Sequence, residues 1–372
     1  MSVRACIADG AELARIGGVH CVLWGRVACG LRGPNGGFLP VRMKDIARDL
    51  GLSPMAVSKA LRDHKDISEE TKERVLRRAR ELNYRLDWVA RSLVTGQTFL
   101  VGLVIPDLKQ SFFSEVATAV EAVLAEAGYH LLISHTGENA KEEATTIDLL
   151  VSRKVDGLII ASAQRDAGAF EKLKTPYVLI DRKVAGLEAN FVGARNDEIG
   201  FMATEHLIEQ GCRRIAHLRG PRLSTGAGRA RGYRRALEKR GLEFRDEWLV
   251  DAGHEDGSGF AAMEALLELE ERPDGVFCFN DPVAVGALRA ILGRGLKVPE
   301  DVAVIGVANM HYSELLTVPL STVDQATASM GSLAARMLLE CMGAGGRGPA
   351  LRERLVRPTL IERASSLRRR PR

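Results

Sequence analysis

Residues 41–84 read VRMKDIARDLGLSPMAVSKALRDHKDISEETKERVLRRARELNY, and this stretch decides the fold of the first part of the chain. Apolar residues repeat at helical spacing from Met43 to Leu50. Gly51 can end that helix because glycine readily adopts a positive φ. Ser53 is a typical N-cap, and Pro54 suits the first position of the next helix. The pattern predicts two short helices joined by a tight glycine turn.

A third helix is expected over residues 68–83. It begins at Ser68, and Glu69 and Glu70 in its first turn are favourable against the helix dipole. Three short helices of this kind make a helix-turn-helix module of about 45 residues. The alternative is a plain three-helix bundle with a solvated face. The outer face of the second helix carries short or cationic side chains that can reach base edges and phosphates, namely Pro54, Met55, Ser58, Lys59 and Arg62.

The charge is unevenly distributed along the 372 residues, although the net charge is only +4. Residues 41–95 carry 13 basic and 9 acidic side chains, and residues 352–372 carry 8 and 2. Residues 96–351 carry 27 basic and 35 acidic side chains. A cationic front on an acidic body is typical of a protein that contacts nucleic acid at one end, with ordinary solvated charge as the alternative.

Composition excludes several classes of protein. No apolar run approaches the roughly 20 residues of a membrane-spanning helix. The six cysteines show no CxxC pairing, which excludes a disulfide scaffold or a zinc ribbon and favours a reducing compartment. Residues 1–40 show neither an export signal nor a sustained period, so we expect a leader without regular structure, or translation that properly begins near Val41. A cytoplasmic protein without a membrane partner is predicted.

From residue 98 onward, strands and helices alternate. This pattern predicts parallel sheets with helices on both faces, and the length favours two similar subdomains around a cleft. Expected strands are Phe99–Ile105, Tyr129–Ser134, Gly157–Ala161, Pro176–Ile180, Arg213–Leu218, Trp248–Asp251, Gly275–Phe279 and Val302–Val307. Expected helices are Phe113–Glu126, Lys141–Lys154, Gly200–Gln210, Arg229–Arg240, Gly259–Glu270 and Pro282–Gly293.

No catalytic or cofactor motif stands out. The glycines of residues 226–232 have GxGxxxG spacing, one residue too long for a dinucleotide fingerprint, so we expect a loose loop at the edge of the cleft. There is no nucleophile elbow, HExxH or paired-carboxylate motif, and neither a metal nor a cofactor is expected. Asp181-Arg182 and Asn280-Asp281 follow strands, where polar side chains suit a neutral ligand that bears hydroxyl groups. Helix caps and local ion pairs are the alternative reading.

The chain closely resembles the lactose/galactose repressor (LacI/GalR) family of bacterial transcription regulators over residues 41–365. The N-terminal residues that carry the resemblance are Val41–Ala47, Gly51–Ser53, Val57–Leu61, Ile67–Thr71, Leu82–Tyr84 and Ala90–Leu93. In the rest of the chain they are Gly102–Asp107, Ile180–Arg182, Glu205–Leu207, Arg229, Gly232-Tyr233, Phe279–Asp281 and Val304–Gly306.

The resemblance implies an N-terminal all-α helix-turn-helix domain over residues 41–85 and a hinge helix and linker over residues 86–97. It also implies an α/β effector and dimerisation domain over residues 98–365, built of two doubly wound parallel-sheet subdomains like a periplasmic binding protein. A basic tail, 366–372, would follow. Expected partners are double-stranded operator DNA, a small metabolite and a second copy of the chain.

Site residues follow from the same resemblance. Leu93 would insert into the minor groove from a hinge helix that folds on DNA. The expected DNA-binding residues are Ser53, Pro54, Met55, Ser58, Lys59, Arg62, Ser68, Thr71, Tyr84, Ala90 and Leu93. The expected effector-binding residues are Phe112, Asp181, Arg229, His254, Asn280 and Gln325.

Three departures from the family pattern concern the hinge and the effector. Leu86-Asp87 replace the usual Pro-Asn, Ala308-Asn309 replace an Asp pair, and Arg195 stands where Asp is common. A charged effector is favoured if Arg195 faces the cleft. A solute-binding protein of the same fold, an enzyme carrying a DNA-binding module, and a partner protein that assists the metabolite remain alternatives. The direction of control stays open.

Overall fold

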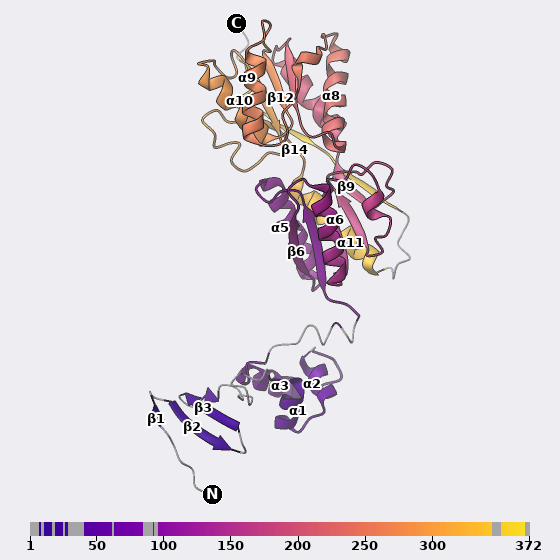
Figure 1. The fold of residues 1–372 in the computed structure, drawn as a ribbon, viewed down its shortest axis with the longest axis vertical. Coiled ribbons are helices and arrows are strands. Elements are labelled where there is room, and N and C mark those ends of the chain that lie inside the picture. The colour runs from indigo at the N-terminus through magenta and orange to yellow at the C-terminus, as the bar shows by residue number, and fades with distance from the viewer. Residues whose placement is uncertain are drawn as a thin grey trace. The chain divides into compact units, whose positions relative to one another are not determined.

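The computed structural model describes residues 41–61, 63–84, 92, 96–343 and 351–368, together with the backbone of four strands in the first 40 residues. The chain divides into two compact units, Met1–Arg91 and Ser92–Arg372, each with its own fold (Figure 1). Arg62, Ala90 and Leu93, three of the expected DNA-binding residues, lie outside the described residues.

The first 40 residues differ from expectation, since parts of their backbone form an antiparallel sheet. Its strand order is β1-β2-β3-β4. A signal was available in the sequence, because Gly17-Gly18 between two six-residue segments is a dipeptide typical of tight hairpins. The strands are β1 (Ile7–Ala8), β2 (Ala11–Ile16), β3 (Val19–Trp24) and β4 (Val27–Ala28).

Three helices follow, and they are those that the sequence predicts: α1 (Met43–Leu50), α2 (Pro54–Leu61) and α3 (Glu69–Glu81). Gly51 takes φ +66° and ends α1 in the left-handed conformation. The small core between the helices includes the fully buried Ile46, Val57 and Val75. This packing fixes the angle of α2 and leaves its outer face exposed.

The second unit begins with an N-terminal subdomain built on a six-stranded, entirely parallel sheet of order β15-β9-β8-β7-β5-β6. Helices α5 and α11 pack on one face, and α6 packs on the other. The strands are β5 (Leu100–Ile105), β6 (His130–His135), β7 (Gly157–Ile160), β8 (Tyr177–Ile180), β9 (Phe191–Ala194) and β15 (Glu353–Val356). The helices are α5 (Ser111–Glu126), α6 (Ala140–Ser152) and α11 (Thr327–Gly343), with a 3-10 turn η1 (Gly168–Phe170).

The C-terminal subdomain repeats this design with a sheet of order β11-β10-β12-β13-β14-β16, parallel except for β16. Helices α7 and α8 cover one face, and α9 and α10 cover the other (Figure 1). The strands are β10 (Ile215–Arg219), β11 (Leu249–Asp251), β12 (Gly275–Cys278), β13 (Ala303–Val307), β14 (Ser321–Asp324) and β16 (Thr359–Ile361). The helices are α7 (Asn196–Glu209), α8 (Ser224–Arg240), α9 (Asp256–Leu267) and α10 (Asp281–Gly293), with a 3-10 turn η2 (Asp246–Trp248).

The chain crosses between the subdomains three times, after β9, after β14 and between β15 and β16. These crossings give the cleft its hinge, and they use elements that the sequence reading did not predict. Strands β9, β14, β15 and β16 have only three or four residues each, too few for a periodic pattern to stand out. The expected fold class, a helix-turn-helix domain followed by two doubly wound subdomains, is confirmed.

The glycines of residues 226–232 do not form the expected loop, because they lie in the first turns of α8. They allow α8 to cross α7 closely. A Cβ on Gly232 would lie 2.2 Å from the Asp197 carbonyl oxygen, and a Cβ on Gly200 would lie 2.0 Å from the Arg229 carbonyl oxygen. The glycine spacing therefore allows α7 and α8 to pack closely. This packing fixes the position of Arg229 on α8.

Candidate functional site

The start of α2 presents the expected recognition surface. Ser53 caps the helix by accepting a hydrogen bond from the Ala56 backbone N–H at 3.1 Å. Met55 is 65% exposed, so its side chain is accessible to a partner. Ser58 lies half-buried on the same helix. Pro54 and Met55 thus stand at the open end of the helix, where base edges can be reached.

Lys59 is held by an acidic residue that the sequence reading did not single out. Its Nζ lies 2.9 Å from Oδ2 of Asp66, in the loop between α2 and α3. This hydrogen bond is the main cause of the lowered pKa of Asp66. His64 Nδ1 lies 3.3 Å from the same oxygen. An anionic or polar partner of the Lys59 ammonium group would therefore have to displace Asp66.

Three other expected DNA-binding residues have structural partners in the described chain. Ser68 caps α3, since its Oγ accepts the Thr71 backbone N–H at 3.4 Å and lies 2.9 Å from the Thr71 hydroxyl. The backbone N–H of Tyr84 bonds the Ala79 carbonyl at 2.8 Å, and its ring packs against the helix-turn-helix core. Ser68 and Thr71 therefore stabilise the start of α3, and Tyr84 stabilises its end.

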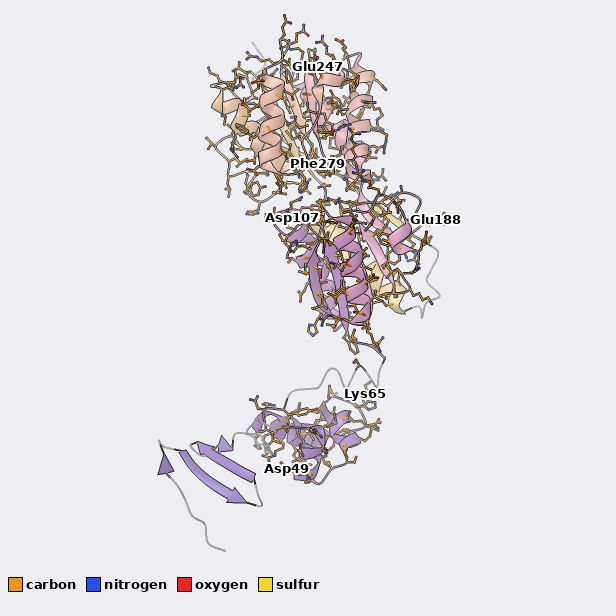
Figure 2. The ribbon with its side chains drawn as sticks, viewed as in Figure 1. Asp49, Lys65, Asp107, Glu188, Glu247 and Phe279 are labelled. Atoms are coloured by element: carbon orange, nitrogen blue, oxygen red, sulfur yellow. The ribbon has the colours of Figure 1, made fainter. Side chains whose placement is uncertain are left out.

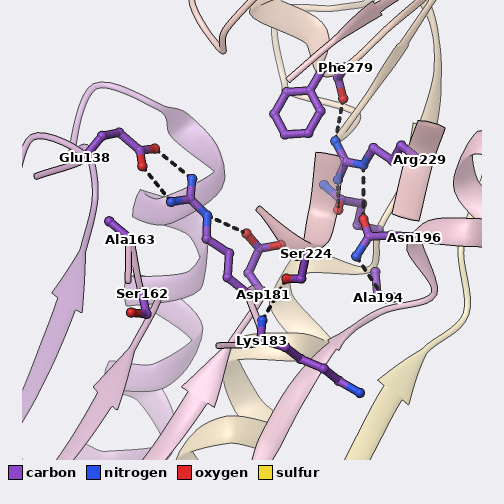
Figure 3. Close-up of polar contacts among 12 residues, drawn as sticks. Glu138, Ser162, Ala163, Asp181, Lys183, Ala194, Asn196, Ser224, Arg229 and Phe279 are labelled. Atoms are coloured by element: carbon purple, nitrogen blue, oxygen red, sulfur yellow. Dashed lines mark hydrogen bonds and ion pairs between the residues drawn. The ribbon is translucent and has the colours of Figure 1, made fainter. Parts of the chain in front are cut away.

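Asp181 lies after β8 at the face of the N-terminal subdomain that meets the cleft (Figure 3). It is buried, and its backbone is left-handed with φ +64°. Burial raises the pKa of its carboxyl group, while Arg182 and Arg229 oppose that rise. Arg182 stands 3.6 Å from Asp181 through Nε and donates two 2.7 Å hydrogen bonds to Glu138. A carboxylate and a guanidinium group are thus fixed side by side.

Arg229 on α8 is 3% exposed and bonds only uncharged acceptors among the described residues. It donates to Asn196 Oδ1 at 3.1 Å, to Gln325 Oε1 at 2.7 Å and to the Phe279 carbonyl (Figure 3). Its guanidinium carbon stacks 4.5 Å from the centre of the Phe279 ring. Burial lowers the pKa of Arg229 to about 10. A buried cation that forms no ion pair with the described residues favours a ligand group that can accept hydrogen bonds.

Asn280 bonds one other expected effector-binding residue, His254. Its Oδ1 caps α10 through the Val283 N–H at 3.0 Å, and its Nδ2 donates to the His254 carbonyl at 3.0 Å. The neighbouring Asp281 is fully buried and accepts hydrogen bonds from Thr322, Ser313 and Met310, which makes it a structural residue. The capping alternative therefore describes Asn280, while Asp281 holds the loop after β13 and strand β14 together.

The structure brings several of the six expected effector-binding residues together. Arg229 bonds Gln325, Asn280 bonds the backbone of His254, and Asp181 interacts electrostatically with Arg229. Phe112 is 6% exposed and stacks edge-on against Phe113, with ring centres 5.0 Å apart.

A cavity of about 460 Å³ opens between the two subdomains, and His254 is the expected residue that lines it. The sequence did not predict the charged residues that line this cavity, because they come from separate loops that only the tertiary fold brings together. Its lining comes from Glu138, Ala140, Ala163, Gln164, Arg165 and Asp166 on one side, and from Pro221, Arg222, Leu223 and His254 on the other.

Two of the sequence departures have local partners. Arg195 forms an ion pair with Glu198 at 2.8 Å, on the first turn of α7. Asn309 donates to Asp324 at 3.1 Å and accepts from Arg363 at 2.9 Å. Both side chains are therefore engaged within the protein.

Comparison with known proteins agrees with this architecture. Residues 42–87 match the bacterial regulatory proteins of the lacI family, and residues 204–366 match a periplasmic binding protein-like domain. The HTH-type transcriptional repressor PurR of Mannheimia succiniciproducens is 32% identical over 329 residues, covering 87% of this chain and 98% of the relative. The chain belongs to the LacI family. As a LacI-family protein, it is a DNA-binding transcription regulator with an effector-binding domain, and it is not an enzyme.

Two solved structures of LacI-family regulators share the fold. A complex of the transcriptional regulator CelR with cellobiose has a TM-score of 0.67 and 28% identity, covering 87% of this chain and 99% of that one. A lac repressor dimer bound to operator and the anti-inducer ONPF has a TM-score of 0.79 and 25% identity, covering 89% and 100%. Among the described residues of the chain, no helix is both long and apolar enough to cross a membrane.

Proposed function

We propose that this LacI-family regulator is a homodimeric repressor that binds a pseudo-palindromic operator and responds to a small metabolite in its cleft. Support comes from the PurR relatives, which are transcriptional repressors, and from the lac repressor structure, which is a dimer on its operator. Two-fold symmetry in the protein matches two-fold symmetry in the DNA. The protein acts in the cytoplasm, on nucleoid DNA.

On the DNA side, Pro54, Met55 and Lys59 read base edges from the open end of α2. The supporting observations are the 65% exposure of Met55 and the position of Lys59, whose ammonium group is held by a single exposed carboxylate. Ser53, Ser58, Arg62, Ser68, Thr71 and Tyr84 would contact the backbone, and Ala90 and Leu93 in the hinge segment 86–97 would contact the minor groove.

The effector is a polar, hydroxyl-bearing molecule such as a sugar or a sugar derivative. The observation that carries this assignment is the pairing of acid and base at the cleft, where Asp181 and Glu138 stand beside Arg182 and near Arg229. Hydroxyl groups can donate to the carboxylates and accept from the guanidinium groups at once. Of these four residues, Glu138 lines the cavity of about 460 Å³, whose volume is within the range of small-molecule sites.

Closure of the cleft would carry the signal to the DNA-binding unit. The two subdomains touch directly where the Lys183 backbone N–H donates to Ser224 Oγ, at 2.8 Å (Figure 3). A ligand that bonds both walls favours the closed arrangement of the subdomains. If the closed and open arrangements differ in their affinity for DNA, the ligand changes DNA binding.

A ligand screen followed by a DNA-binding measurement tests this function. Thermal shift of the full chain against sugars, sugar acids and nucleosides should identify a stabilising compound, and that compound should change the affinity for an operator selected from genomic fragments. Arg229→Gln should abolish the thermal shift. Arg231→Gln, on the exposed side of the same helix, is the matched control and should retain it. A compound that shifts both variants equally would contradict the cleft assignment.

A further inference from the structure

The mouth of the cleft gathers three metal-ligating side chains from distant parts of the chain. Asp107 follows β5 in the N-terminal subdomain, and His254 and Glu255 lie between β11 and α9 in the C-terminal subdomain. One ligand atom from each residue lies within 4.8 Å of the other two. In Figure 2, Asp107 stands at the edge of its subdomain that faces the C-terminal subdomain.

These three side chains have few competing partners. Within the described part of the chain, none of them forms an ion pair with a lysine or arginine. Asp107 Oδ1 accepts the Lys109 backbone N–H at 3.0 Å, which leaves Oδ2 available. Glu255 occupies the N-cap position of α9 without making a capping hydrogen bond. Two carboxylates and an imidazole are thus placed together, and within the described part of the chain none of them is ion-paired.

Two hydrogen bonds hold the backbone of the C-terminal part of the cluster, at His254 and Glu255. The Asn280 amide holds the His254 carbonyl at 3.0 Å. Ser258 Oγ donates to the Glu255 carbonyl at 2.8 Å, at the first turn of α9. Asp107 and His254 are half-buried, and Glu255 is exposed, so an ion has a path to the site.

We propose that Asp107, His254 and Glu255 bind one divalent transition-metal ion of the zinc type, which clasps the two subdomains together. An imidazole with two carboxylates is a donor set that zinc accepts, with water in the remaining position. Ligand atoms on one zinc ion lie about 3.3 Å apart, as follows from bond lengths of about 2.0–2.2 Å. The three atoms must therefore approach one another by up to about 1.5 Å, and the ion would then join the two cleft walls.

With this clasp, closure of the cleft depends on the metal ion as well as on the effector. Asp107 is on one wall, while His254 and Glu255 are on the other, so the ion favours the closed arrangement whichever metabolite is present. His254 also lines the cavity, which places the ion at the entrance of the proposed effector site. The proposal does not depend on the identity of the effector or on DNA binding.

Metal titration of the full chain, made without a polyhistidine tag and stripped with a chelator, tests the clasp. Calorimetry with Zn²⁺ should give one ion per chain, and Co²⁺ should give the visible absorption of a low-coordinate site. Asp107→Asn and Glu255→Gln should each weaken Zn²⁺ binding at least tenfold. Asp166→Asn removes a carboxylate that lines the same cavity and serves as the matched control, which should bind like the wild type.

Three results would overturn the clasp. The first is the absence of Zn²⁺ binding. The second is the same Zn²⁺ affinity for Asp107→Asn, Glu255→Gln and the control Asp166→Asn. The third is a loss with Glu255→Gln but none with Asp107→Asn, because that result means that only one subdomain holds the ion. All of these measurements omit operator and effector, so their failure leaves the proposed repressor function untouched, and failure of that function leaves the clasp standing.

Discussion

At the recognition helix, the ammonium group of Lys59 is engaged before DNA arrives, because Asp66 lies 2.9 Å away and the Lys59 side chain is only 35% exposed. The proposed contact of Lys59 with a base edge would replace this ion pair by a hydrogen bond to the DNA. Lys59 should therefore add less to the affinity for DNA than a lysine without a partner would. In return, Asp66 fixes the direction in which the Lys59 side chain points. A residue with a fixed direction is suited to reading a base rather than to attracting phosphate in general.

Replacement of this lysine tests its role as a base-reading residue. Lys59→Ala should weaken operator binding by roughly 1–3 kcal/mol per half-site and relax base preference at one position. Fluorescence anisotropy against a set of operators mutated one base at a time measures both effects. A uniform loss across all of these sequences would mean that Lys59 contacts phosphate.

Removal of the competing carboxylate should have the opposite effect. Asp66→Asn frees Lys59 and should tighten DNA binding several-fold at low salt, with a larger gain for non-specific than for operator DNA. Asp63→Asn removes the same charge from the same loop but leaves the Lys59 pair intact, since Asp63 bonds Lys72 at 2.6 Å. Equal gains from the two variants would show that the loop acts only through net charge.

At the scale of elements, the close crossing of α7 and α8 positions the cleft. A Cβ on Gly200 would meet the Arg229 carbonyl oxygen at 2.0 Å, so any side chain there pushes α8 away from α7. Because the guanidinium of Arg229 is bonded to three neighbours, a small displacement of α8 strains all three bonds.

A glycine-to-alanine pair tests this coupling between helix packing and the cleft. Gly200→Ala should destabilise the protein by about 1–3 kcal/mol and weaken effector binding. Gly293→Ala, at the end of α10, is the control, because no atom beyond its own neighbouring backbone lies within 4 Å of its added Cβ, and it should be neutral or slightly stabilising. Melting curves with and without effector measure both. A stable Gly200→Ala protein with normal effector affinity would contradict the coupling.

These elements also show how far the sequence could be read. Gly51, Ser53 and Pro54 have local roles in a turn, so the helix-turn-helix module followed from spacing alone. The crossing strands and the cavity lining could not be predicted in that way. Glu138 and Arg182 form an ion pair although they are 44 residues apart in the sequence. Asp66 could not be singled out either, because an acidic residue in a loop normally indicates only a solvated side chain.

At the scale of the whole molecule, acid should destabilise the effector-binding unit through a buried histidine. His217 is completely buried between strands, stacks 4.3 Å from the centre of the Phe277 ring, and bonds the Phe277 carbonyl through Nδ1 at 2.9 Å. Burial lowers the pKa of His217 to about 3, well below its ordinary value of 6.5. The folded state therefore excludes the protonated form, while the unfolded state accepts it. The associated stability is present above pH 6.5 and is lost as the pH falls toward 3.

The variant His217→Gln removes this titration. Between pH 7.5 and pH 5, the wild type should lose about 2 kcal/mol of unfolding free energy more than His217→Gln loses. His135→Gln changes an exposed histidine of β6 and should keep the wild-type dependence. Urea unfolding followed by circular dichroism measures the difference. Parallel pH profiles for the wild type and His217→Gln would exclude His217 as the source.

If the proposed function is right, a polar metabolite in the cleft controls DNA binding by the helix-turn-helix unit. The direct measurement is the operator dissociation constant of the full chain, by fluorescence anisotropy, with and without a saturating amount of the compound found in the thermal-shift screen. We predict at least a tenfold change for the wild type and for Arg231→Gln, and no change for Arg229→Gln. A wild-type operator affinity that stays the same at saturation would contradict the account.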